Sequence, residues 1–198
     1  MSSLFSLRNL FSALALCGTL ALAGCGGGDA EFRGSDISGS KLGADLAMVD
    51  DSGQPRTLDD YKGKVLVAFF GFTQCPDVCP TSMSQLAHAM ELLEDDADQV
   101  QVLMITVDPE RDTPEVLSSY VKAFDPTFVG LTGTTEQLAA TAKSFRTFYA
   151  KVPGTTPDDY TMDHGASFYV MDKSGDARVL LRPDAPADDL VHDIRELL

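Results

Sequence analysis

The sequence predicts an α/β domain with a mixed β-sheet flanked by helices. Apolar runs at residues 65–70 and 100–107 are continuous and of strand length, as expected for strands buried on both faces of a sheet. Segments with helical spacing of their apolar residues follow both runs, and this alternation is typical of α/β domains. A hairpin at 166–171 and 178–181, followed by an amphipathic helix from about residue 186, closes the chain.

Three helices are expected before the closing hairpin. Apolar residues recur every three or four positions over residues 81–95, with polar residues between them. Residues 113–124 begin with a threonine, a proline and a glutamate. These supply an N-cap hydroxyl, a proline at the first helical position and an acidic first turn. A further helix is expected from residue 134 or 135 to about residue 148.

Shorter segments complete the predicted fold. Residues 46–49 and 55–58 form a hairpin around polar turn residues, and residues 128–131 form a short strand. Residues 150–163 contain two prolines and a glycine, and we interpret them as a long loop, a kind of segment that is often functional. The order of elements matches a thioredoxin-like mixed sheet flanked by helices, with the first hairpin as an N-terminal addition.

The composition is that of an acidic globular protein. The 198 residues include 15 basic and 30 acidic side chains, which gives a formal net charge of −15. Loss of a signal segment that contains Arg8 would leave 14 basic and 30 acidic residues, a net charge of −16. Such a charge argues against nucleic acids and anionic lipid headgroups as binding partners.

Residues 1–24 have the pattern of an export signal. Arg8 is their only charged residue, and the apolar run at 10–23 is shorter than the roughly 20 residues of a membrane-spanning helix. The signal ends in Leu22-Ala23-Gly24-Cys25, which resembles a bacterial lipobox, whose cysteine carries lipid and becomes the mature N-terminus. The alternative is an uncleaved anchor. Either form places the domain outside the cytoplasm, and the lipidated form holds it at the periplasmic face of the cell membrane.

A tether and one folded domain follow the signal. Residues 25–40 are rich in Gly, Ser and Asp and are expected to be a flexible tether, which leaves residues 41–198 as the domain. Cys17 lies in the signal and Cys25 would carry lipid, so the domain contains one cysteine pair, at positions 75 and 79. An oxidising compartment closes such a pair into a disulfide unless a reductant or a metal keeps it open.

Cys75 and Cys79 lie in a loop between a predicted strand and a predicted helix. If the helix begins near Cys75, the two Cβ atoms are roughly 5–6 Å apart on one helical face, and both sulfurs can reach one metal ion. A helix N-terminus also favours a thiolate, because its first N–H groups are unpaired. The pair is therefore compatible with a metal site, a redox couple or a structural disulfide. Its spacing differs from the Cys-x-x-Cys of redox thioredoxins.

His164 directly precedes the strand predicted at 166–171. In thioredoxin relatives the loop at this place lies against the cysteine loop, so the imidazole is expected near the two sulfurs. Two thiolates and one imidazole suit Cu(I), and they can also hold Cu(II). Zinc usually takes a fourth ligand, and the sequence offers no evident one. Asp163 is a candidate acceptor for the second ring nitrogen of His164.

Several motifs together resemble the Sco/SenC family. They are Gly71-Phe72-Thr73-Gln74-Cys75-Pro76-Asp77-Val78-Cys79-Pro80, the acidic and proline-containing segment 107–115, residues 124–126, residues 131–133 and the pair Asp163-His164. The resemblance covers residues 41–198. It implies a thioredoxin-like fold, membrane anchoring and one copper ion bound by Cys75, Cys79 and His164. Most members of the family are anchored by a transmembrane helix, so the lipobox at residues 22–25 is a departure.

The resemblance implies a copper carrier rather than an enzyme, with no catalytic residues. Members of the family help to build the binuclear CuA centre of cytochrome c oxidase. The expected partners are therefore the CuA-bearing subunit, a copper donor protein and a thiol reductant. The alternative is an extracytoplasmic thiol-disulfide oxidoreductase in which Cys75 and Cys79 reduce the cysteines of that subunit or act in redox defence. A third interpretation is an interaction module with a structural disulfide between the same two residues.

Overall fold

The structure, a computed structural model, describes residues 30–156 and 159–198 and contains an eight-stranded mixed sheet. The predicted signal and Cys25 lie outside the described residues. Within the described ranges, no helix is both long and apolar enough to cross a membrane. In spatial order the strands are β1 (Ser35–Asp36), β10 (Ala177–Leu181), β9 (Phe168–Met171), β4 (Val65–Gly71), β5 (Val100–Thr106), β6 (Val129–Thr132), β2 (Ala47–Asp50) and β3 (Pro55–Thr57).

The two strands predicted to be central lie side by side in the middle of the sheet. β4 and β5 pair in parallel from Val65 opposite Val100 to Gly71 opposite Thr106, and every residue of β4 is buried. β6 continues the parallel set beside β5, whereas β9 pairs antiparallel with β4. The mixed sheet is therefore confirmed. Because β4 and β5 run in the same direction, their carboxyl ends meet at one edge of the sheet.

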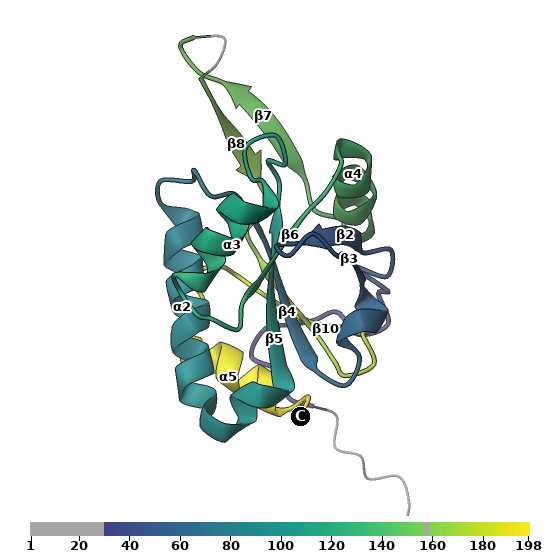
Figure 1. The fold of residues 1–198 in the computed structure, drawn as a ribbon. Coiled ribbons are helices and arrows are strands. Elements are labelled where there is room, and N and C mark those ends of the chain that lie inside the picture. Colours follow the sequence, from purple (N-terminus) through teal and green to yellow (C-terminus); the bar gives the residue numbers. More distant parts are fainter. Residues whose placement is uncertain (1–29, 157–158) are drawn as a thin grey trace, which may run out of the picture. The chain divides into compact units, whose positions relative to one another are not determined.

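Helices cover both faces of this sheet (Figure 1). They are α2 (Val78–Leu93), α3 (Pro114–Lys122), α4 (Thr135–Ser144) and α5 (Ala187–Arg195), with short 3₁₀ helices η1 (Leu58–Tyr61) and η2 (Glu94–Gln99). Neighbouring phenylalanines of β4 point to opposite faces, as the pleat requires. Phe70 packs against Phe145, just after α4. Phe69 packs against Phe168 on the other face, which α2 covers. The core is thus a sheet between two helical layers.

Two helices differ in extent from the prediction. α2 begins at Val78, ahead of residue 81, and Pro80 is accommodated in its first turn, where a backbone N–H has no helical partner in any case. α4 ends at Ser144, ahead of residue 148. Arg146 has a φ of +52°, a left-handed conformation that cannot continue a right-handed helix.

The segment 150–163 was expected to be a loop, and this expectation is wrong. It forms a two-stranded antiparallel sheet of β7 (Tyr149–Pro153) and β8 (Tyr160–His164), with a connection from residue 154 to residue 159. Of the residues that suggested a loop, Pro153 ends β7 and Gly154 follows it, whereas Pro157 lies outside the described residues. The hairpin projects from one end of the molecule (Figure 1), and most of its β7 side chains are exposed, so it lacks the buried alternation of a core strand.

The folded unit begins earlier than residue 41. Within the predicted tether 25–40, β1 pairs antiparallel with β10. The backbone N–H groups of Arg33 and Gly34 donate to the Asp193 carboxylate of α5, at 2.7 Å and 2.8 Å. Residues 33–36 are therefore attached to the domain and are not part of a free tether.

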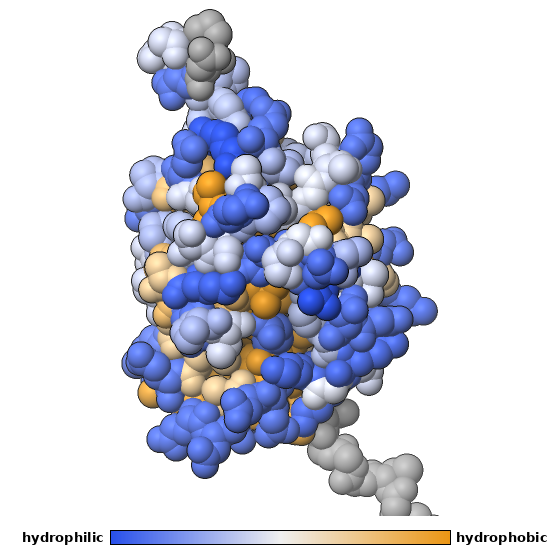
Figure 2. All heavy atoms as spheres, in the orientation of Figure 1, coloured by the Kyte–Doolittle hydropathy of each residue, from blue (hydrophilic) through white to orange (hydrophobic). Residues whose placement is uncertain are grey.

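The visible surface is mostly hydrophilic. On the face in Figure 2, hydrophilic residues predominate and hydrophobic colour is confined to small, separate areas.

The N-terminal hairpin of β2 and β3 is confirmed, and it extends the sheet by antiparallel pairing of β2 with β6.

Replacement of Leu117 tests the packing of α3 on the sheet. Leu117 is fully buried, and it packs so closely on Gly130 of β6 that a Cβ there would meet its Cγ. Leu117→Ala should lower the free energy of unfolding by about 2–5 kcal/mol, because it leaves a cavity. Val116→Ala on the exposed side of the same helix should change it by no more than about 0.5 kcal/mol. Urea unfolding measures both, and equal losses would contradict this packing.

Candidate metal centre

The candidate site begins where β4 ends. Gly71 is its last residue, and a Cβ at this position would lie 3.2 Å from Cys79 Sγ and 2.8 Å from a ring carbon of Phe69. Only glycine leaves room for the Cys79 sulfur beside the sheet without displacing its neighbours. The backbone N–H of Val107 donates to the Gly71 carbonyl at 2.9 Å, which joins the ends of β4 and β5.

The two cysteines occupy different environments. Cys79 is the second residue of α2 and is fully buried, whereas Cys75 lies in the preceding loop and is partly exposed. The backbone N–H of Cys79 donates to Cys75 Sγ at 3.4 Å. Burial raises the pKa of the Cys79 thiol, because a thiolate loses its hydration in the apolar interior. α2 begins at Val78, after Cys75. The sulfur of Cys75 accepts a hydrogen bond from one of the N–H groups in the first turn of this helix, which have no helical partner.

His164 reaches this pair from a distant part of the sequence. It is the last residue of β8, and its Nε2 lies 3.7 Å from Cys79 Sγ. The rings of Phe69 and Phe72 meet the imidazole edge-on, with centroids 6.5 Å and 5.8 Å away. These apolar walls hold the ring and limit the access of water to it. The prediction that His164 approaches the cysteine loop agrees with this geometry.

The expected role of Asp163 does not match the structure. The Nδ1 atom of His164 lies 3.0 Å from the carbonyl oxygen of Gly165. Asp163 is exposed and, as the neighbouring residue on β8, points to the opposite face of the strand. A backbone carbonyl therefore orients the imidazole. This acceptor leaves Nε2, the nitrogen that faces the sulfur, free to bind a metal.

The three predicted ligands do not form one cluster in this structure. Among residues 30–156 and 159–198, no group of three or more His, Cys, Asp or Glu side chains is arranged to hold a metal ion. Cys79 and His164 are brought together, and Cys75 touches the same site through the Cys79 backbone. The other two histidines lie elsewhere. His88 is exposed beside Glu91, and His192 contacts Asp193 on α5.

A buried carboxylate that the sequence analysis did not single out supports the cysteine loop. Asp112 is fully buried, and it accepts hydrogen bonds from the Thr106 hydroxyl at 2.6 Å and from the Thr73 backbone N–H at 3.1 Å. The Thr73 hydroxyl donates to its other oxygen at 2.5 Å. Its position just after a buried strand, at the sheet edge that carries the cysteines, is the signal that could have identified it. Burial raises the pKa of Asp112.

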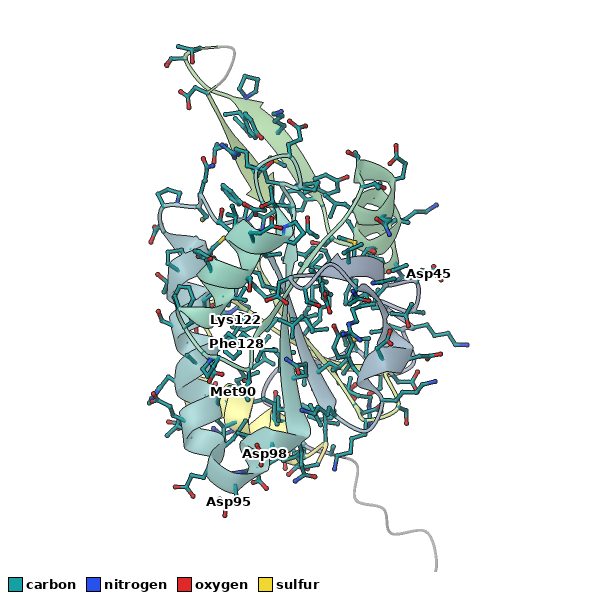
Figure 3. All side chains as sticks on the ribbon, in the orientation of Figure 1. Asp45, Met90, Asp95, Asp98, Lys122 and Phe128 are labelled. Carbon is teal, nitrogen blue, oxygen red and sulfur yellow. The ribbon has the colours of Figure 1, made fainter. Side chains whose placement is uncertain are left out.

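The site and the acidic connection after α2 lie at opposite ends of the domain. That connection is η2, and it is marked in Figure 3 by the labels Asp95 and Asp98. It lies far from the projecting hairpin, whose base carries His164. The two cysteines follow the carboxyl end of β4, beside the end of β5, where open α/β sheets usually bind their ligands.

These features define a thioredoxin-like domain with a cysteine pair and a histidine at one edge of its sheet. The chain belongs to the SCO1/SenC family, whose profile matches residues 35–198. A SCO2-like protein of Rickettsia felis is 40% identical over 136 residues, which are 68% of this chain and 66% of that protein. The matched region thus spans just under two thirds of that relative.

Solved structures agree with this assignment. Sco1 of Thermus thermophilus, solved in its apo form, is 39% identical with a TM-score of 0.77, and the match covers 87% of this chain and 100% of that one. ScoI of Bradyrhizobium japonicum, solved with copper bound, is 35% identical with a TM-score of 0.72, and the match covers 83% of this chain and 99% of that one. The thioredoxin-like fold and the family predicted from the sequence are both confirmed.

Asp112→Asn should change the pH dependence of stability. Because the pKa of Asp112 is raised in the folded protein, the folded state holds a proton that the unfolded state releases above the ordinary value of 3.8. The contribution of Asp112 to the free energy of unfolding is therefore largest below that value and declines as pH rises through the raised pKa. Urea unfolding from about pH 4 to about pH 7 should show the advantage of the native protein over Asp112→Asn shrinking with pH.

A matched variant controls for the loss of one negative charge. Asp45 is exposed and lies at the periphery of the molecule in Figure 3, so Asp45→Asn removes the same charge without touching the site. An advantage of the native protein that grows with pH would show that Asp112 is instead stabilised as a carboxylate.

Proposed function

We propose that this domain carries copper on Cys75, Cys79 and His164 and delivers it to the CuA-bearing subunit of cytochrome c oxidase. The observation that carries the proposal is the 3.7 Å approach of His164 Nε2 to Cys79 Sγ, between residues 85 positions apart in the chain. Membership of the SCO1/SenC family supports it, as does the copper-bound structure of the Bradyrhizobium relative. Copper is the cargo of such a protein, which makes it a carrier rather than an enzyme.

The donor set suits copper. Thiolate sulfur and imidazole nitrogen are the ligands that Cu(I) prefers, and the same set also accepts Cu(II). Cys79 is neutral while buried and metal-free, and it must lose its proton when it binds, so copper uptake releases protons. The apolar rings around His164 lower the local polarity and strengthen each metal–ligand contact. Cys75, the partly exposed member, would complete the set.

Delivery needs partners and a location. A site with three protein ligands leaves room for an incoming thiolate from the CuA-bearing subunit before the donor ligands leave. We infer that a copper donor protein loads the site and that a thiol reductant keeps Cys75 and Cys79 reduced. We also infer that lipid on Cys25 holds the domain at the periplasmic face of the cell membrane.

Replacement of Cys25 by serine should release the protein into the soluble fraction, because serine cannot carry this lipid.

Copper binding by single variants tests the ligand set. The reduced chain, with Cys17 and Cys25 replaced by serine so that two thiols remain, should bind about one copper ion in the presence of a competing chelator. Cys75→Ala, Cys79→Ala and His164→Ala should each weaken binding by more than about a hundredfold, beyond the effect expected for residues that only orient a ligand.

His88→Ala is the matched control for this experiment. His88 is an exposed histidine on α2, and its loss should leave copper affinity unchanged. The carrier function fails if the native chain binds copper weakly or if His164→Ala retains full affinity.

A thiol-disulfide oxidoreductase is the second candidate. The observation that favours it is the 3.4 Å contact of the Cys79 N–H with Cys75 Sγ at the start of α2, because such a donor stabilises charge on an attacking sulfur. The Cys75 thiolate would attack one sulfur of a partner disulfide, which breaks the partner S–S bond, forms a mixed disulfide and releases the other partner sulfur as a thiolate. Cys79 would then displace the partner thiol, leaving a Cys75–Cys79 disulfide for an external thiol to reduce.

The His164→Ala variant separates the two functions. A carrier loses its copper, whereas an oxidoreductase keeps most of its disulfide-reducing activity, because the attacking sulfur is that of Cys75 and the imidazole contacts Cys79. Activity towards a disulfide-containing peptide, measured beside copper affinity, distinguishes them. A pure reductase would bind copper no more tightly before the substitution than after it.

A further inference from the structure

The strand that carries His164 is weakly attached to the rest of the domain. β7 and β8 pair with each other and, within the described residues, neither belongs to the eight-stranded sheet. Backbone hydrogen bonds of the main sheet therefore do not fix the imidazole relative to the cysteines. Isolated two-stranded hairpins are marginally stable in water. Side-chain contacts must hold this hairpin over the cysteine loop.

Arg111 contacts both the cysteine loop and the β7–β8 hairpin. Its Nη1 donates to Gln74 Oε1, next to Cys75, and to the backbone carbonyl of Tyr160 on β8, each at 3.0 Å. Its Nε forms an ion pair with the buried carboxylate of Asp108. One guanidinium thus connects the cysteine loop, the end of β5 and the hairpin. We call these contacts the Arg111 bridge.

Ring contacts strengthen the bridge. The guanidinium carbon of Arg111 lies 3.7 Å from the centre of the Tyr160 ring, and Lys151 Nζ lies 3.8 Å from the same centre. Two like charges cannot share one face of a ring at these distances, so the ring lies between them. The Tyr160 hydroxyl donates to Asp108 at 2.9 Å. Cation–π contacts of this kind are worth about 0.5–2 kcal/mol each.

Arg111 has little freedom to make other contacts. Its side chain is about one fifth exposed, and its Nη2 is buried without a hydrogen-bond partner among the described residues. The face of the guanidinium is used instead, against the rings of Tyr160 and Phe72. Phe72 also touches His164 edge-on. The Phe72 ring therefore lies against both the Arg111 guanidinium and the His164 imidazole.

We propose that Arg111 is a positioning residue that holds the β7–β8 hairpin in the place where His164 Nε2 faces Cys79 Sγ. The bridge acts through His164 and takes no part in binding the metal itself. It sets how much of the time the imidazole is available to the sulfurs. This inference rests on the proposed function for its consequence in copper affinity, but the attachment of the hairpin can be measured without copper.

The first test follows backbone hydrogen exchange in the copper-free full chain. Arg111→Met keeps the apolar stem and removes the guanidinium. Amides of residues 149–152 and 160–164 should exchange at least about tenfold faster than in the native protein, while those of β4 and β5 should not change. The restriction to the hairpin is the decisive feature, since general destabilisation would accelerate exchange throughout the sheet.

Arg178→Met is the matched control. Arg178 also combines an ion pair, a side-chain hydrogen bond and a ring contact, with Asp172, Ser38 and Phe32, but it joins β10 to the N-terminal segment. Its loss should leave the exchange of the hairpin unchanged. Arg111→Lys is the second variant, in case Arg111→Met does not fold. A lysine keeps the charge but lacks the planar fork that contacts both segments, so the hairpin should again exchange faster.

The second test is a double-mutant cycle on copper affinity. Arg111→Met should weaken copper binding about tenfold in the native background, the lower end of the range for residues that orient a ligand. It should have no further effect in the His164→Ala background, because the bridge acts through the imidazole. A loss that persists without His164 overturns the proposal, as does unchanged hairpin exchange in both Arg111 variants. If the native chain binds no copper, the proposed function fails, and the exchange experiment still decides whether Arg111 holds the hairpin.

Discussion

The parallel pairing of β4 with β5 is the constraint on which the candidate site depends. It places the ends of the two strands side by side, so the cysteine loop that follows Gly71 meets the turn that holds Asp112. Burial of both strands fixes this register, because a shift by one residue would exchange the faces on which Phe69 and Phe70 pack. The position of the sulfurs is therefore set first by core packing, and the hydrogen bonds from Thr73 to Asp112 support the loop that carries them.

The histidine half of the site is built differently. His164 lies at the base of a hairpin that, within the described residues, shares no backbone ladder with the central sheet. Side-chain contacts hold this hairpin in place, among them apolar rings, the Arg111 guanidinium and the ion pair of Lys151 with Glu110. Such contacts are weaker and easier to break than the interior of a sheet. The site thus joins a rigid half, set by the fold, to a half whose placement depends on a few side chains. This division suits the proposed carrier, which would have to take up and release copper.

Much of the fold could be predicted because its signals are local. The continuous apolar runs of β4 and β5, the N-cap sequence of α3 and the cysteine spacing each depend on a few neighbouring residues. The hairpin of β7 and β8 could not be predicted in this way. Its strands have exposed side chains, and its prolines and glycine outweighed any strand pattern. Arg111 and Tyr160 were missed for another reason, since they meet only in the folded chain and are 49 positions apart.

The unequal burial of the two cysteines gives the site a direction. Cys79 lies under the surface against Gly71, whereas Cys75 is reachable from solvent. In the proposed carrier, an approaching acceptor would meet the metal on the side of Cys75 and displace that sulfur first. Cys79 and His164 would release the metal last. Loading would follow the reverse order, so the inner pair would retain the ion during a failed encounter and prevent its escape into the surrounding medium.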